Sequence, residues 1–177
     1  MVGLDRQQVR IESHREAWHE CYRVETDRLS RGIADDTIRF EHVGSTAVEG
    51  LPAKPVIDIL ATVDSIDTAD SLVEPLGEMG YELRPDDRDR LFFARGAAES
   101  RTQYLHVAEA ESTYATQMVV FRDHLRENPD VAAAYAELKR SLAEQFPEDR
   151  DSYTEGKSAF VTRVLDELPD SSPARRG

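Results

Sequence analysis

The sequence predicts an α/β fold in which a mixed β-sheet flanked by helices is followed by a helical C-terminal cap. Up to about residue 108, short apolar runs that end at turn residues are typical of β-strands. From Ser112 onward, apolar residues recur with the spacing of amphipathic helices. The chain of 177 residues is long enough for one domain with its own core. We expect that domain to cover residues 1–168 and the polar tail, 169–177, to be disordered.

Local signals place the elements of the sheet region in order. Ser13 as a cap, Glu16 three residues later and Gly32 as a stop predict a helix over residues 13–31. A second helix is expected over residues 67–79. Residues 9–12 form a short alternating segment, and the predicted strands are 37–43, 55–63, 81–84, 90–95 and 103–108.

Three apolar stripes at helical spacing predict the C-terminal cap. They begin at Tyr114, Val131 and Phe160. The pairs Asn128-Pro129 and Phe146-Pro147 separate them, because proline disfavours helical geometry in the residue before it.

The composition excludes several classes of protein. No stretch approaches the roughly 18 consecutive apolar residues of a membrane span, and the N-terminal residues lack the apolar block of a secretory signal, so we expect a cytoplasmic protein. The single cysteine, Cys21, excludes an intramolecular disulfide framework and cannot by itself build a zinc site. Folding must therefore rest on packing.

The net charge of −13 disfavours nonspecific binding to nucleic acid or to an anionic membrane. Two explanations of this acidity stay open: adaptation to a high-salt cytoplasm, and an ordinary acidic surface. The basic residues are divided unevenly, with 19 arginines but only three lysines, Lys54, Lys139 and Lys157. The first and last of these lysines lie in motif-like contexts, whereas Lys139 lies on an ordinary helix.

The segment 40–63 holds the main candidate site. Gly44 permits close approach of a ligand to the backbone, Ser45 and Thr46 offer hydroxyls, and exposed N–H groups there attract anions. Asp58 interrupts an apolar strand, where a carboxylate is unfavourable unless it is paired, hydrogen-bonded or metal-bound. We interpret Asp58 as a metal ligand or general base, with a structural carboxylate as the alternative.

Four further residues are candidates on the basis of strand parity. Glu41 is the nearest carboxylate in sequence that might accompany Asp58, unless it is a solvated edge residue. His106 becomes a base or an orienting group if its strand neighbours that of Asp58. Lys54 lies four residues before Asp58 on the same strand face, which suits a cation for phosphate as well as a surface lysine. His42 continues an apolar face, which favours a core histidine over a catalytic one.

Four other cations are candidates for phosphate binding. Arg95 belongs to an arginine-rich segment, 84–101, that is either a positive rim or a solvated surface. Arg122 and Arg126, one helical turn apart, suit an anion or ordinary pairing with acidic neighbours. Lys157 lies one turn after a tyrosine on the last helix, and the same two readings apply to it.

The string EHVGSTAVEGLPAKPVIDI (41–59), together with the later LHV, FRDHLR and Y-x-x-x-K-x-x-F elements, resembles the GrpB family. Members of this family are also similar to the domain fused behind dephospho-CoA kinase in some bacteria. The similarity covers the chain from about Val9 to Leu168. The resemblance implies the nucleotidyltransferase fold, in which a Gly-Ser turn holds nucleotide phosphates and strand carboxylates, here Asp58, bind Mg²⁺.

The chain departs from the pattern of active nucleotidyltransferases at one position. Those enzymes usually present two acids two residues apart on the second strand, whereas Asp58 is followed at that offset by Leu60. One carboxylate makes a poor two-metal site, so Glu41 or His106 would have to replace the missing acid. Glu49 also stands where the family commonly has proline.

Two hypotheses follow from the sequence. In the first, the protein binds a nucleotide or another phosphorylated small molecule and transfers a nucleotidyl group with magnesium. In the second, it is a non-catalytic binding or accessory module, linked to coenzyme A biosynthesis or to a protein partner.

Overall fold

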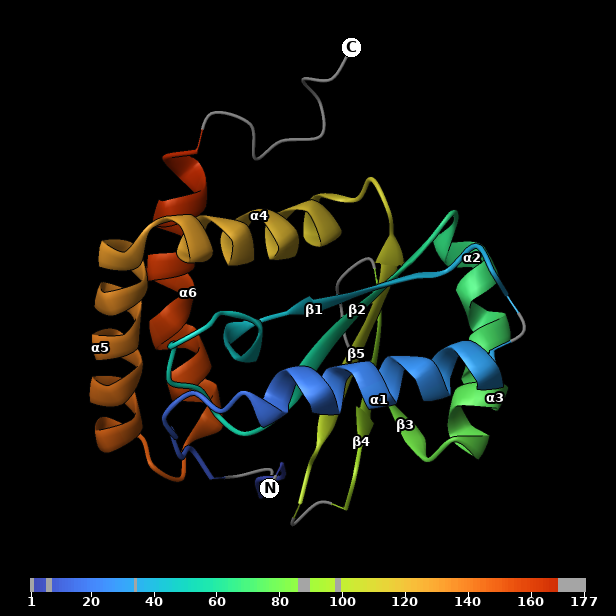
Figure 1. Ribbon diagram of the computed structural model, residues 1–177, viewed down its shortest axis with the longest axis horizontal. Coiled ribbons are helices and arrows are strands. Elements are labelled where there is room, and N and C mark those ends of the chain that lie inside the picture. Colours follow the sequence, from blue (N-terminus) through green and yellow to red (C-terminus); the bar gives the residue numbers. More distant parts are fainter. Residues whose placement is uncertain (1, 6–7, 34, 86–89, 98–99, 169–177) are drawn as a thin grey trace.

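The computed structural model has a five-stranded mixed sheet at its centre (Figure 1). Its description covers residues 2–5, 8–33, 35–85, 90–97 and 100–168. The sheet has the order β1-β2-β5-β4-β3, and within it only β2 and β5 are parallel. The strands are β1 (Arg39–Val43), β2 (Ile57–Val63), β3 (Tyr81–Arg84), β4 (Leu91–Arg95) and β5 (Gln103–Glu109). The predicted mixed sheet is confirmed, whereas the tail 169–177 lies outside the described residues.

The helices form two groups on opposite sides of the molecule (Figure 1). The first group is α1 (Ala17–Gly32), α2 (Ile66–Ala69) and α3 (Val73–Glu78). The second is the C-terminal cap of α4 (Thr113–Glu127), α5 (Pro129–Gln145) and α6 (Arg150–Asp166). The pairs Asn128-Pro129 and Phe146-Pro147 separate the cap helices, as the sequence predicts.

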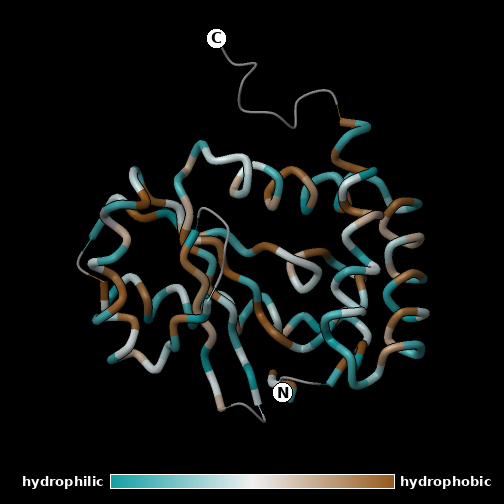
Figure 2. Tube along the Cα trace, turned by 180° about the vertical axis from the view of Figure 1, so that it is seen from behind, coloured by the Kyte–Doolittle hydropathy of each residue, from teal (hydrophilic) through white to brown (hydrophobic). Residues whose placement is uncertain are grey.

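The main core lies between α1 and one face of the sheet. Trp18 and Leu29 of α1 are fully buried against Ile57, Ile59 and Leu105 of the two central strands. Figure 2 shows brown, hydrophobic residues gathered along these strands, whereas the outer helices alternate between brown and teal. Alternation along β2 turns Asp58 away from this core and toward the opposite face.

Two predicted elements differ from the observed ones. The first helix begins at Ala17 and not after Ser13, because backbone hydrogen bonds between Glu12 and Ala53 hold the chain extended just before it. The predicted helix 67–79 is divided into α2, a 3₁₀ turn (Asp70–Leu72) and α3, because Pro75 lacks the N–H that a continuous helix requires.

On the second face of the sheet, α4 packs over a smaller apolar cluster. Val43, Leu60, Ala108 and Ala115 form it, and Leu60 is fully buried there. The position that would carry a second acid therefore holds a core residue beneath a helix. The part of this face that α4 leaves open carries Asp58.

Candidate functional site

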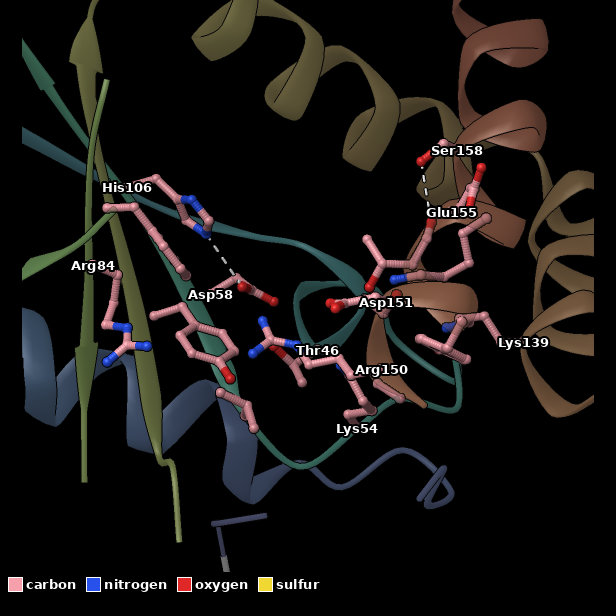
Figure 3. Close-up of a pocket in the computed structure, with 18 of the residues that line it drawn as sticks. Thr46, Lys54, Asp58, Arg84, His106, Lys139, Arg150, Asp151, Glu155 and Ser158 are labelled. Atoms are coloured by element: carbon pink, nitrogen blue, oxygen red, sulfur yellow. Dashed lines mark hydrogen bonds and ion pairs between the residues drawn. The ribbon is translucent and has the colours of Figure 1, made fainter. Parts of the chain in front are cut away.

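Asp58 and His106 lie together on the open part of the sheet. Because β2 and β5 are adjacent and parallel, both side chains point to the same face, and His106 Nε2 lies 3.3 Å from Asp58 Oδ1 (Figure 3). Burial alone would raise the pKa of Asp58. The hydrogen bond from His106 and the charges of Lys54 and Lys157 outweigh this effect, so the pKa of Asp58 lies below its ordinary value. Asp58 is therefore an ionised, hydrogen-bonded carboxylate.

Three side chains that the sequence analysis did not place beside His106 fix its orientation. The ring of Phe92 is stacked on it with centroids 5.1 Å apart. The hydroxyl of Tyr114 lies 2.9 Å from His106 Nδ1, and Arg90 contacts the same nitrogen. Because arginine has no acceptor, Nδ1 accepts and Nε2 carries the proton toward Asp58. His106 is thus a positioned donor to the carboxylate.

The three lysines of the chain all line one cavity, although they come from separate segments. Lys54 precedes β2, Lys139 lies on α5 and Lys157 lies on α6. The Nζ atoms of Lys54 and Lys157 lie 5.1 and 4.5 Å from the ring centre of Tyr153. That of Lys139 lies 4.8 Å from the ring centre of Tyr135. The cluster depends on α5 and α6 packing against the loop before β2.

Burial lowers the pKa of each lysine. The pKa of Lys54 falls to about 7, with Lys157 and Arg150 adding to the effect of burial. The pKa of Lys157 falls only to about 8, because the charge of Asp58 offsets part of the effect of burial. That of Lys139 falls to about 6, where burial and the charge of Lys157 act in the same direction. Each ammonium group lacks the solvation or counter-charge that would hold its ordinary pKa.

The cavity has a volume of about 850 Å³ and lies between the sheet and α6. In Figure 3, His106 and Arg84 of the sheet lie on the opposite side from Asp151 and Glu155 of α6. Its six basic side chains are Lys54, Lys139, Lys157, Arg84, Arg90 and Arg150, and its three acidic ones are Asp58, Asp151 and Glu155. The lining is therefore positive in a chain whose net charge is −13. Such a concentration of cations attracts anions.

The Gly44–Thr46 turn contributes two hydroxyls to the edge of this cavity. Ser45 and Thr46 both line it. Thr46 Oγ1 lies 3.0 Å from His42 Nε2, and the Ser45 hydroxyl is hydrogen-bonded to the phenol of Tyr135. His42 is buried, as expected, and its contact with Thr46 connects the end of β1 to the turn.

Glu41 and Arg122 are paired with each other. Glu41 shares the face of Asp58 but lies two strand positions farther along, and its carboxylate accepts a hydrogen bond from Arg122 Nη1 at 2.5 Å. Arg122 also donates to the His42 carbonyl at 3.0 Å and to Asp123. The structure therefore does not bring Glu41 to Asp58 as a second carboxylate, and the guanidinium of Arg122 is already neutralised.

Arg95 lies outside the site, which corrects its placement among the phosphate-binding candidates. Its side chain is on the opposite face of the sheet, where Nη1 donates to Glu25 at 2.9 Å and to Gln103 at 3.4 Å. Phe93, two residues earlier on β4, is fully buried on that same core face. Strand parity thus turns Arg95 away from His106.

Gly44 is required by the position of Asp58, which leads to a prediction. Its φ is +71°, and a Cβ there would lie 2.6 Å from Asp58 Oδ2. We expect Gly44→Ala to lower the free energy of unfolding by about 1–3 kcal/mol, measured by urea denaturation. Gly77→Ala is the matched control, because nothing lies within 4 Å of a Cβ at that helical position and alanine favours helix. Equal stability of both variants would contradict this role of Gly44.

A family model described as GrpB protein matches residues 8–167. The chain belongs to the GrpB family. It is 39% identical to a UPF0157 protein of Pseudomonas aeruginosa over 84% of this chain, and it spans 63% of that relative's length. It is 33% identical to the glutamate-rich protein GrpB of Alkalihalophilus pseudofirmus, over 95% of this chain and all of that relative. A dephospho-CoA kinase of Mycolicibacterium paratuberculosis is 32% identical over 76% of this chain and 39% of its own length.

Solved structures confirm the nucleotidyltransferase-like fold. GrpB from Enterococcus faecalis superposes with a TM-score of 0.80 and 32% identity, over 88% of this chain and 94% of that one. The Cid1 poly(U) polymerase with Mg 3′-dATP bound has a TM-score of 0.56 and 15% identity, over 82% of this chain and 49% of that one. At that identity the second likeness concerns the fold alone.

Within the described ranges, no three histidine, cysteine, aspartate or glutamate side chains are placed to hold a metal ion together. Among the helices of the same ranges, none is both long and apolar enough to cross a membrane.

Proposed function

We propose that this GrpB-family protein binds a nucleotide or another phosphorylated small molecule in the cavity lined by its three lysines. The convergence of those lysines on one cavity supports the proposal, because the lining is positive while the chain as a whole is strongly acidic. Charge-assisted hydrogen bonds from ammonium and guanidinium groups to phosphate oxygens are among the strongest in proteins. An entering phosphate would also supply the counter-charge that the lysines lack.

The candidate residues divide into two groups. Lys54 and Lys157, with Arg150 beside them, are the phosphate-binding cations that the cavity brings together. Ser45 and Thr46 offer hydroxyls at its edge, and Gly44 allows the turn to lie against Asp58.

A second cavity favours a nucleotide over a simple phosphate. It has a volume of about 340 Å³, is mostly apolar, and shares Ser45 and Tyr114 with the lysine cavity. Phe121 and Tyr135 present rings in its lining. An aromatic base could stack on these rings while its phosphates extend past Ser45 toward the lysines.

Magnesium would have to enter with the ligand. Asp58 is the single carboxylate that β2 offers, since Leu60 is buried and Glu41 is paired with Arg122. Mg²⁺ is often held by one or two carboxylates together with substrate phosphates, so Asp58 suits an ion that the phosphates bring with them. The residues do not fit a two-metal transfer site, and we therefore propose binding without assigning a transfer step.

Isothermal titration with nucleoside triphosphates, dephospho-coenzyme A and inorganic tripolyphosphate, with and without Mg²⁺, tests this proposal. We expect binding that weakens with salt. Asp58→Asn should strengthen binding without Mg²⁺, because it removes a repelling charge, and weaken binding with Mg²⁺. Lack of binding across the panel, or an Asp58→Asn variant that behaves as wild type under both conditions, would reject the proposal.

The same titration panel distinguishes the second hypothesis, a non-catalytic accessory module, from the first. One relative that carries the name dephospho-CoA kinase is matched over 39% of its length, which motivates a non-catalytic module linked to coenzyme A. Preference for dephospho-coenzyme A over every nucleoside triphosphate would favour that module.

A further inference from the structure

The lysines of this chain are set apart from its arginines by number and by place. Arginine supplies 19 of the 22 basic residues, yet all three lysines line the same cavity. Arginine stays protonated in proteins, whereas a buried lysine readily gives up its proton and becomes a nucleophilic amine. The cavity therefore holds every side chain of the protein that can act as a neutral primary amine.

Lys54 is the lysine whose amine is open to the cavity. Among the described residues, its Nζ makes no hydrogen bond or ion pair, and it lies over the ring of Tyr153. The Nζ of Lys139 donates to the carbonyl of Pro52, and that lysine is only 2% exposed. The amine of Lys54, and not that of Lys139, is therefore free to attack a ligand in the cavity.

The charges around Lys54 give it a lower pKa than Lys157. Burial, then the charges of Lys157 and Arg150, lower the pKa of Lys54 to about 7, and only Asp58 acts in the other direction. The pKa of Lys157 stays higher, at about 8, because Asp58 supports its charged form. At neutral pH, Lys157 and Arg150 are the cations that hold an anion, and Lys54 is partly a neutral amine.

We propose that Lys54 is a nucleophilic lysine that acyl phosphates acylate, with Lys157 and Arg150 holding the phosphate group. The Nζ of Lys54 attacks the carbonyl carbon, and a C–N bond forms as the bond from that carbon to the phosphate oxygen breaks. Phosphate leaves and takes the amine proton, so the products are an amide and hydrogen phosphate. This inference rests on the proposed function, since both require a phosphate to enter the lysine cavity.

Acylation would also limit ligand binding. The amide is uncharged, so the cavity loses one of its six basic side chains. We expect the acylated protein to bind nucleoside triphosphates more weakly than the unmodified protein does.

The test uses the whole chain, acetyl phosphate as the probe, and mass spectrometry of the intact protein and its peptides. We expect Lys54 to gain the first acetyl group, at a rate that saturates with acetyl phosphate and that tripolyphosphate slows. Arg163→Lys adds an ordinary amine on the exposed side of α6 as an internal reference. Lys54 should react at least about tenfold faster than this amine at pH 7.5, since an unperturbed lysine is almost fully protonated there.

Lys54→Arg should abolish the fast phase while the protein stays folded, and the wild-type readouts do not depend on that variant. Equal acetylation of all the lysines, or a rate that neither saturates nor responds to tripolyphosphate, overturns the inference. If nucleotides bind in the titration but Lys54 is not acetylated, this inference fails and the proposed function stands. If neither occurs, both fail.

Discussion

Replacing Lys157 by methionine is expected to weaken the binding of nucleoside triphosphates about tenfold to a hundredfold at pH 7, because one charge-assisted hydrogen bond contributes about 1.5–3 kcal/mol. Methionine has nearly the length of lysine and keeps the packing over Tyr153, so the change removes mainly the charge. The lysine lies in the cavity near Asp58 and Arg150. Isothermal titration of wild type and variant measures the effect.

Arg163→Met is the matched control for this substitution. Arg163 lies on the same helix, is exposed, and does not line the lysine cavity, yet its loss changes the net charge by the same amount. We expect a small, salt-sensitive change in affinity for the control. A similar loss in both variants would mean that the overall charge, and not the cavity, attracts the ligand.

The second large effect concerns stability. Lys139→Met is expected to raise the free energy of unfolding of the ligand-free protein by about 1–3 kcal/mol at pH 7, because burial makes the charged amine unfavourable in the folded chain while the unfolded chain keeps its proton. Lys139 is 2% exposed and donates to the Pro52 carbonyl, which would lose that hydrogen bond in the variant. Urea denaturation of both proteins measures the difference.

The pH dependence of this difference is a sharper test. The folded-state pKa of Lys139 is lowered to about 6, so between about pH 6 and 10.5 the unfolded chain binds a proton that the folded chain does not. Lys139 therefore destabilises the fold increasingly as pH falls through this range. The advantage of Lys139→Met should grow from pH 10 to pH 6. An advantage that stays constant or shrinks over this interval would show that Lys139 is charged in the folded protein.

The periodicity of the sequence was sufficient to predict most of the fold. Alternation along residues 55–63 places Asp58 opposite the core formed by Ile57 and Ile59, as the structure shows. The predicted start of α1 was wrong, because the bridge between Glu12 and Ala53 is a tertiary contact that local capping signals cannot indicate.

The cavity could be predicted only in part. Lys54 and Lys157 were candidates from their contexts, but Lys139 was interpreted as an ordinary helical lysine because its cavity forms only when α5 packs on the loop before β2. The scarcity of lysine was a usable signal for Lys139. Arg95 was misplaced because its face depends on strand register, which the sequence does not specify.

The central claim is that a phosphate anion binds among lysines whose pKa values are lowered, and proton uptake on binding tests it most directly. A bound anion favours the charged lysines, and near pH 8 the groups whose pKa lies at about 7, 6 and 8 can each take up a proton. A nucleoside triphosphate titrated at pH 8, in two buffers of different ionisation enthalpy, should bind with net proton uptake that decreases in Lys157→Met. Binding without proton uptake, or with proton release, would contradict the claim.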